Sequence, residues 1–249
     1  PEECEKMIAA AKKNKVKLSV GFQQRYNPRT AFLIRAREED QFGNIMFVKC
    51  QALRRRGIPN WGVFGQKALQ GGGPMIDIGV HIIEAAHYFM GSPKPVAASG
   101  NVWTYLGDKP SKVVSMWPGW DYKTYTVEDL AIGQIRFENG ATLYFETSWT
   151  MHIKEDKTYF EIAGSKGGAT LEPKFEIFSE KYNDLADLKT VLATESFDFN
   201  SAFKDEIDHF TDCILAGIEC IAPAQDGVTI MKILDAVYKS AETGKLIEI

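Results

Sequence analysis

The sequence predicts an α+β protein with one open, mainly antiparallel sheet and helices on one of its faces. Three observations support this fold class. The strand patterns gather in the middle of the chain, helical patterns flank them on both sides, and Asn139-Gly140 supplies a tight turn between two alternating segments. With 249 residues, the chain is long enough for one large domain or two modest ones.

The first segment has a helical pattern followed by a strand pattern. Residues 1–15 place Met7, Ile8 and Ala11 at helical spacing, and Pro1 suits a first turn. The stretch VKLSVGF, Val16 to Phe22, is typical of a short buried strand. One helix and one strand cannot bury themselves, so we expect the tail of a βαβ unit whose earlier strands are missing, and hence a fragment.

The next segments alternate between helix and strand patterns. A helix is expected from residue 29 to near Gly43, a strand over residues 44–56, and a loop followed by a helix over residues 71–91. A hairpin over residues 130–149 follows, with Ile135 and Phe137 facing away from its polar side. Two or three further strands are expected up to residue 181. Two helices then close the chain, the second ending at Gly244.

Composition and charge limit the classes of function. The chain is 45% hydrophobic and 25% charged, as in ordinary globular proteins. Its net charge of −4 argues against nucleic acid and membrane partners, and no apolar stretch is long enough to span a bilayer. The cysteines form no CxxC pair and no signal peptide is visible, so we expect reduced thiols and a cytoplasmic location.

A polar stripe interrupts the apolar helix expected over residues 75–90. Asp77, His81, Glu84 and Tyr88 fall on one narrow line, while most other positions are apolar. A buried carboxylate or imidazole is unfavourable unless it is paired, so this line is expected to face a cleft. The glycines at 71–73 would let the backbone approach closely at the mouth of that cleft.

Two other interpretations of the stripe stay open on the pattern alone. Asp77 could cap a helix N-terminus while His81 is a hydrogen-bonded core histidine. Alternatively, Asp77, His81 and Glu84 could share a metal ion, but no further His or Cys is placed to complete the ligand set, so no metal is predicted.

Several motifs together resemble the C-terminal domain of the glucose–fructose oxidoreductase, inositol dehydrogenase and MocA (Gfo/Idh/MocA) family. The family pattern G-G-G-x-x-x-D-x-G-x-H-x-x-D stands here as Gly71 to Gly73, Asp77, Gly79, His81 and Glu84, with Glu in place of the usual Asp. The resemblance runs from residue 1 to 249. Further similar stretches are residues 21–28, 137–149, 161–173, 203–217 and 224–249.

The resemblance implies two regions. Residues 1–27 would be the C-terminal end of a truncated Rossmann nucleotide-binding domain, and residues 28–249 an α/β domain for substrate binding and oligomerisation. Family members carry a Gly-rich phosphate turn and an E-K-P motif with a catalytic Lys, and neither occurs in this sequence. We therefore expect NAD or NADP to serve the full-length protein, and the fragment alone to bind no cofactor and to be inactive.

The implied chemistry is hydride transfer between NAD(P) and a carbon bearing a hydroxyl, on a sugar, a polyol or a related substrate. His81 would be the base, since the pKa of imidazole is about 6.5, and Asp77 would bind a substrate hydroxyl or tune the imidazole. No other residue is assigned to catalysis. The expected substrate contacts are Trp61, Tyr26 and Glu84, and the expected cofactor contacts are Gln23 and Arg25.

Three expectations complete the sequence-based hypothesis. Arg54, Arg55 and Arg56 are interpreted as a solvated strand end, with a pocket role as the alternative. A homodimer or homotetramer is expected through the open sheet face, where Ile132, Tyr144 and Tyr159 would lie. Alternative functions are an NAD-using glycosidase of the same superfamily and a non-catalytic sugar-binding or assembly module.

Overall fold

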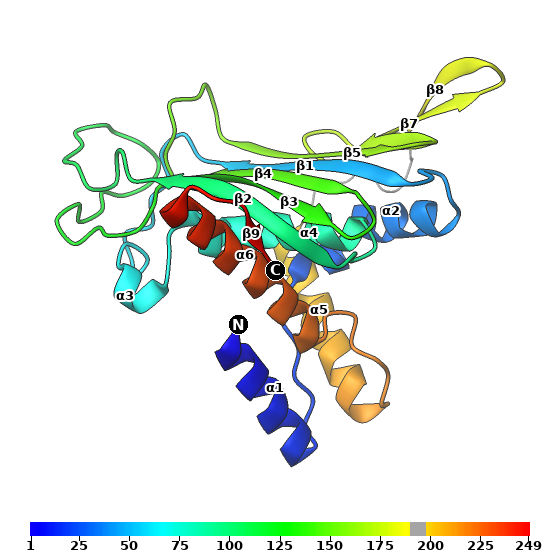
Figure 1. Cartoon of the computed structure of the whole chain (residues 1–249), viewed down its shortest axis with the longest axis horizontal. Helices are drawn as coiled ribbons and strands as arrows, with labels where there is room; N and C mark the ends of the chain where they lie inside the picture. Colours follow the sequence, from blue (N-terminus) through cyan, green and yellow to red (C-terminus); the bar gives the residue numbers. More distant parts are fainter. Residues whose placement is uncertain (190–197) are drawn as a thin grey trace.

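The computed structural model describes residues 1–189 and 198–249, and it confirms the predicted fold class. The strands form an open sheet with the helices on one side of it (Figure 1). Among the described residues, nine strands pair in the order β8-β7-β6-β5-β1-β4-β3-β2-β9. β1 and β4 are parallel, and the other neighbouring pairs described are antiparallel.

The centre of the sheet has an unusual connection. β4 and β5 are consecutive along the chain, yet β1 lies between them and pairs with both. The strands are β1 Ile45–Leu53, β2 Pro95–Trp103, β3 Leu130–Phe137, β4 Thr142–Ser148, β5 Lys157–Gly164, β6 Gly167–Thr170, β7 Glu176–Lys181, β8 Asp184–Leu188 and β9 Ile247–Glu248.

The hairpin of β3 and β4 has the predicted two faces. Ile135 and Phe137 are buried, while Gln134 and Arg136 are exposed, as strict alternation requires. On β4, the side chains of Leu143 and Phe145 continue the buried face, which packs against the helices.

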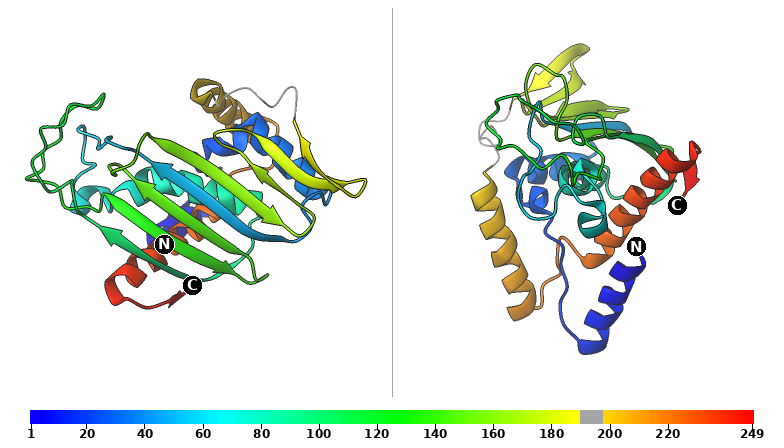
Figure 2. Two further views of the ribbon diagram at one scale, coloured as in Figure 1. Left: turned by 90° about the horizontal axis from the view of Figure 1, so that it is seen from above. Right: turned by 90° about the vertical axis from the view of Figure 1, so that its left-hand side faces the viewer.

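Three helices cover the inner face of the sheet, while α1 and α5 extend away from it (Figure 2). Pro28 begins α2 at a position where its missing N–H is not needed, and the Asn27 side chain caps the helix by accepting from the Arg29 N–H. The helical elements are α1 Glu2–Asn14, η1 Gln23–Tyr26, α2 Pro28–Glu38, α3 Lys67–Gln70, η2 Met75–Gly79, α4 Val80–Phe89, α5 Phe199–Leu215 and α6 Ala224–Thr243.

The main core lies between the inner sheet face and α2, α4 and α6. Val48 and Cys50 of β1 meet Ile83 and Phe89 of α4 there, and all four side chains are buried. Burial of such apolar area is the dominant favourable term in folding, so α4 is fixed against β1 and β4.

The structure corrects four local predictions. Val16 to Phe22 forms no strand, because no strand of the described residues lies beside it; Ser19 makes an isolated bridge to Pro223. The α2 helix ends at Glu38 instead of near Gly43. The strands β2, β8 and β9 were not predicted from the sequence. The segment expected as one α-helix begins with a π-helical turn, Met75–Gly79, before α4.

Candidate functional site

A cavity of about 600 Å³ opens where β1 and β5 meet η1, η2 and α4. This volume lies in the range of pockets that bind small molecules. Its walls combine apolar side chains such as Ile78, Phe160 and Leu171 with a convergent polar set. The polar set includes Gln23, Gln24, Arg54, Asp77, His81 and Lys157.

Asp77 and His81 of the predicted polar stripe both line this cavity, whereas Glu84 and Tyr88 of the same stripe do not. Asp77 lies in the π-helical turn η2, and His81 follows in the first turn of α4. The Asp77 carboxylate accepts a hydrogen bond from the indole N–H of Trp149, 2.8 Å from Nε1 to Oδ2. Its side chain does not cap η2 or α4, which argues against the capping interpretation.

His81 has the properties of a proton acceptor. Its Nδ1 is shielded from solvent and has no hydrogen-bond partner among the described residues. Burial lowers the pKa of His81, and the nearby charge of Asp77 opposes that shift only in part. The imidazole is therefore neutral near pH 7 and can accept a proton.

Arg25 and Glu84 form a buried ion pair and do not line the cavity. Glu84 Oε1 lies 2.7 Å from Arg25 Nη2, and Arg25 Nη1 lies 2.8 Å from a carboxylate oxygen of Asp226. The Arg25 guanidinium also stacks over the Tyr88 ring at 4.2 Å. Burial raises the pKa of Glu84 to about 7, outweighing the opposing effect of Arg25, and Asp226 adds to the rise.

This ion pair positions a neighbouring side chain at the cavity. Gln23 precedes Arg25 by two residues in the same turn of η1, and Gln23 lines the cavity. Its Oε1 is shielded from solvent and has no hydrogen-bond partner among the described residues. A buried acceptor of this kind normally meets a donor, so a bound ligand is the natural partner.

The structure places Tyr26 and Trp61 away from the cavity wall. The Tyr26 ring packs against His209, with ring centroids 5.8 Å apart. Trp61 is 52% exposed and stacks on Trp117 at 5.7 Å, in an aromatic group beside the cavity-lining strands. Both residues were predicted as substrate contacts because they are aromatic. The local sequence does not indicate which surface the side chain of such a residue faces.

The position of Arg54 contradicts the interpretation of residues 54–56 as a solvated strand end. Arg54 is half-buried, lines the cavity, donates to the Gly57 carbonyl at 2.9 Å and stacks over Trp117 at 4.6 Å. Arg55, by contrast, is exposed as expected. The alternation of β1 could have predicted this position. Arg54 falls on the same face of the strand as the buried side chains of Val48 and Cys50.

Contrary to the prediction, the glycines at 71–73 do not lie at the mouth of the cavity but pack against other parts of the chain. An added Cβ at Gly72 would lie 2.0 Å from the Tyr238 hydroxyl, and one at Gly73 would lie 2.0 Å from the Glu128 carbonyl oxygen. The Gly73 N–H also donates to the Glu128 carboxylate at 2.9 Å. These glycines do not line the cavity; they permit tight packing of the backbone before η2.

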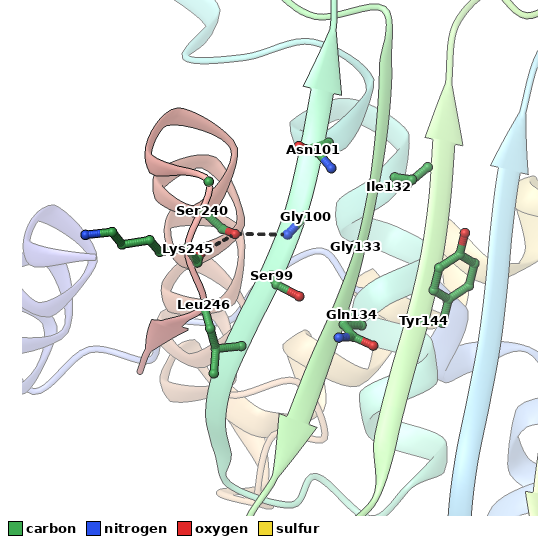
Figure 3. A pocket seen from close by; sticks show the side chains of 11 residues that line it. Ser99, Gly100, Asn101, Ile132, Gly133, Gln134, Tyr144, Ser240, Lys245 and Leu246 are labelled. Atoms are coloured by element: carbon green, nitrogen blue, oxygen red, sulfur yellow. Dashed lines mark hydrogen bonds between the residues drawn. The ribbon is translucent and has the colours of Figure 1, made fainter.

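A second hollow lies on the outer sheet face beside the end of α6 (Figure 3). Ser240 joins the two elements there, accepting from the Gly100 N–H at 3.1 Å and donating to the Lys245 carbonyl. Neither an imidazole nor a carboxylate side chain lines it. It therefore differs from the cavity that Asp77 and His81 line.

Comparison with known proteins identifies the family to which the chain is similar. Residues 36–249 match a family described as "Oxidoreductase family, C-terminal alpha/beta domain". A D-glucoside 3-dehydrogenase of Escherichia coli (strain K12) is 34% identical over 250 residues, covering 100% of this chain and 69% of the relative. A levoglucosan dehydrogenase of Pseudarthrobacter phenanthrenivorans is 28% identical over 178 residues, covering 67% of this chain and 45% of the relative.

Solved structures give the same assignment of fold. A levoglucosan dehydrogenase in complex with NADH and levoglucosan superposes with a TM-score of 0.84 at 21% identity, over 100% of this chain and 70% of that one. An aldose-aldose oxidoreductase from Caulobacter crescentus, complexed with glycerol, gives 0.78 at 25% identity, over 100% and 68%. Among the described helices, none has the combined length and hydrophobicity of a membrane-spanning segment.

Proposed function

The chain belongs to this oxidoreductase family, and we propose that its cavity binds the sugar or polyol substrate of an NAD(P)-dependent dehydrogenase. One observation carries the proposal. A neutral, half-buried imidazole, whose Nδ1 has no hydrogen-bond partner among the described residues, shares a ligand-sized cavity with a carboxylate that accepts from an indole N–H. A purely structural pair would satisfy both groups internally.

His81 is the general base in this proposal. In the oxidation direction, the substrate hydroxyl donates its proton to the imidazole while hydride leaves the same carbon. The lowered pKa keeps His81 neutral, so it can accept that proton at physiological pH. Asp77, fixed by Trp149, orients a substrate hydroxyl and stabilises the imidazolium once it forms.

The cofactor part of the proposal rests on Gln23. NAD(P) supplies the hydride acceptor when it is bound, and the buried, unpartnered Oε1 of Gln23 fits an amide N–H donor such as the nicotinamide carboxamide. Arg25 acts indirectly, by fixing the turn that carries Gln23. We propose that a separate nucleotide-binding domain holds the remainder of the cofactor and that this chain alone does not bind it.

Substrate recognition is proposed for the charged side chains in the wall. Arg54 and Lys157 offer donors to hydroxyl or carboxylate oxygens, while Phe160 offers an apolar surface to a sugar ring. Glu84 does not contact the substrate in this proposal; it pairs with Arg25. Tyr26 and Trp61 would contact substrate only if their segments moved toward the cavity.

Two further properties belong to the proposal. All four cysteines are free, which fits a reducing, cytoplasmic environment. Among the described residues, no helix lies on the outer sheet face, and Ile132, Tyr144 and Tyr159 are partly exposed there, which supports a homodimer or homotetramer formed through that face.

His81→Ala tests the catalytic assignment in the intact enzyme. The kcat should fall by about 10²- to 10⁴-fold, since a general base contributes that much, while the KM for NAD(P) should change little. In the wild type, kcat/KM should rise with pH through a pKa below the usual value for histidine, because only neutral His81 accepts the proton. Steady-state kinetics over about pH 4.5–8 would measure both effects.

His152→Ala is the matched control, because that histidine is exposed and does not line the cavity. It should retain wild-type kinetics. Near-normal activity of His81→Ala would make the buried histidine structural and overturn the assignment. Sugar release without net reduction of NAD(P) would instead support the glycosidase alternative.

A further inference from the structure

A second group of chemistry-bearing side chains lies outside the cavity. His209 and Cys213 are one turn apart on α5, and Cys220 lies in the loop between α5 and α6. One nitrogen and two sulfur atoms of these residues all lie within 4.8 Å of one another. Cys213 is fully buried and the other two are half-buried, so the fold brings three potential metal ligands together in a shielded place.

The distances between these ligand atoms suit the tetrahedral coordination of one metal ion. Bonds of about 2.0 Å to nitrogen and 2.3 Å to sulfur would separate those two ligand atoms by about 3.5 Å in a tetrahedral site. The distance between His209 Nε2 and Cys213 Sγ is 3.4 Å. One ion could therefore reach both atoms with little movement, and Cys220 Sγ needs only a small adjustment.

The structure also shows which form of the imidazole faces the sulfur atoms. The Ile221 backbone N–H donates to His209 Nε2 at 3.0 Å. A backbone amide can only donate, so Nε2 carries a lone pair and the ring proton is on Nδ1. A metal ion would take this lone pair in place of the amide.

Neighbouring groups hold the ligands in place. The Ser19 hydroxyl donates to the Ala222 carbonyl at 2.9 Å and lies 3.1 Å from Cys220 Sγ. The Tyr26 ring packs against the His209 ring and restricts its rotation. Outer contacts of this kind orient the ligands in metal sites. Within residues 1–189 and 198–249, no further His, Cys or carboxylate joins the group.

We propose that His209, Cys213 and Cys220 bind one Zn²⁺ ion, with water or the Ser19 hydroxyl in the fourth position. Two thiolates and an imidazole favour zinc over the hard cations, which prefer oxygen ligands. The two thiols release two protons to solvent as the ion enters, so the completed site is neutral. The ion joins α5 to the loop before α6, and Ser19 links that loop to the segment that leads to Gln23.

This site is independent of the proposed catalytic function and differs from the expectation of reduced, metal-free thiols. Sequence spacing did not reveal it, because the pattern H-x3-C-x6-C joins two ligands on one helix with a third beyond the helix end. The site is structural in kind, since none of its members lines the cavity.

Titration with Co²⁺ tests the proposal. The reduced, chelator-treated chain should develop thiolate-to-cobalt absorption and visible d–d bands that saturate at one equivalent, and Zn²⁺ should abolish them. Zn²⁺ should also raise the Tm, because an ion that binds only the folded state stabilises it. Cys220→Ser and His209→Gln should remove the saturable bands, and Ser19→Ala should weaken binding by about 10- to 100-fold.

Cys4→Ser is the matched control, because Cys4 is also a half-buried free cysteine but lies on α1. It should bind Co²⁺ like the wild type. Circular dichroism would show that each variant folds, and Cys220→Ser does not disturb a fully buried position. The proposal is overturned if the folded, reduced wild type shows no bands, or if the bands survive in both ligand variants. A Cys213–Cys220 disulfide whose reduction produces no metal binding would also overturn it.

Discussion

The Trp149 indole determines how the Asp77 carboxylate lies in the cavity. Trp149 follows the end of β4 and is completely buried, and its N–H donates to Asp77 Oδ2. The packed ring allows that donor little movement. Hydrogen bonds to charged groups are among the stronger ones in proteins, so this contact is a positioning device for the proposed catalytic pair.

Trp149→Phe should reduce activity more than stability. Loss of a hydrogen bond to a carboxylate weakens an interaction of about 1.5–3 kcal/mol, so kcat/KM in the intact enzyme should fall by about 10- to 100-fold. Asp77→Asn should also impair turnover. Trp120→Phe is the control, because its indole donates to the Gly107 carbonyl and lies outside the cavity wall. Equal losses in the two tryptophan variants would contradict the positioning role of Trp149.

At this scale, the sequence predicted that Asp77 and His81 lie together, but it did not predict the residues around them. Asp77 and His81 could be placed on one line because they are local neighbours on a helix. The partner Trp149 is 72 positions away along the chain, and no local pattern connects it to Asp77. Arg25 and Glu84 were selected as contacts for ligands, whereas they contact each other. Pairings of this kind depend on tertiary packing.

The buried cluster around Arg25 joins three elements. Arg25 belongs to η1, Glu84 to α4 and Asp226 to α6, and the guanidinium also donates to the Ile221 carbonyl. Two carboxylates share one cation, so the cluster has an excess of negative charge when both are ionised. This excess, together with burial, accounts for the raised pKa of Glu84.

Glu84 should make stability depend on pH. Its pKa of about 7 in the folded state lies above its value in the unfolded chain, so the folded state retains a proton that the unfolded state loses. The Glu84 contribution to the free energy of unfolding should therefore be present below about pH 4.5 and decline by about 1–3 kcal/mol as pH rises to about 7. Urea unfolding of wild type and Glu84→Gln across this range would measure the difference.

The Glu84→Gln variant should show a weaker decline over the same range, because glutamine cannot ionise. Glu242→Gln is the control: Glu242 is exposed near the end of α6, and its substitution should leave the pH dependence unchanged. If the free energy of unfolding varied with pH in the same way for wild type and Glu84→Gln, Glu84 would ionise in the same pH range in the folded and unfolded states, and the prediction would be wrong.

Secondary-structure elements with a strong hydrophobic periodicity could be predicted from the sequence. Elements whose conformation depends on contacts with distant segments could not. The β3–β4 hairpin and the last helix have clear patterns and agree with the structure. Val16 to Phe22 has a strand pattern but no adjacent strand with which to pair. The π-helical turn adds one residue to a helix turn, and Gly79 fits it closely against Thr147, 3.0 Å from a notional Cβ. Such an insertion hardly changes the hydrophobic pattern.

The whole molecule has one covered and one uncovered sheet face (Figure 2). Lys49, Tyr144 and Glu146 lie on the uncovered face, where the Lys49 ammonium is 4.0 Å from Glu146 and 6.0 Å from the Tyr144 ring centre. Ile132 adds an aliphatic side chain next to Glu146 in the register of β3 and β4. This mixture of aromatic, aliphatic and paired charged groups is suited to a wet protein interface.

Size exclusion with light scattering should show an assembly of at least two chains at a protein concentration on the order of tens of micromolar. The expected mass is at least twice the 27.9 kDa of one chain. Ile132→Asp should shift the assembly toward a monomer, because a charge buried in the interface is unfavourable. Leu69→Asp, on exposed α3, should leave the mass unchanged. A wild-type mass near one chain would contradict association through the sheet.

The position of β1 restricts the order in which the sheet can assemble. Cys50 of β1 lies opposite Phe145 of β4 on one side and Phe160 of β5 on the other. β4 and β5 follow one another along the chain and could close quickly into a local hairpin, but that hairpin would exclude β1 from its native place. Productive folding must keep the two strands apart until β1 has entered, so slow, non-local pairing limits the folding rate. Ribosomal synthesis favours the productive route, since β1 emerges before either partner.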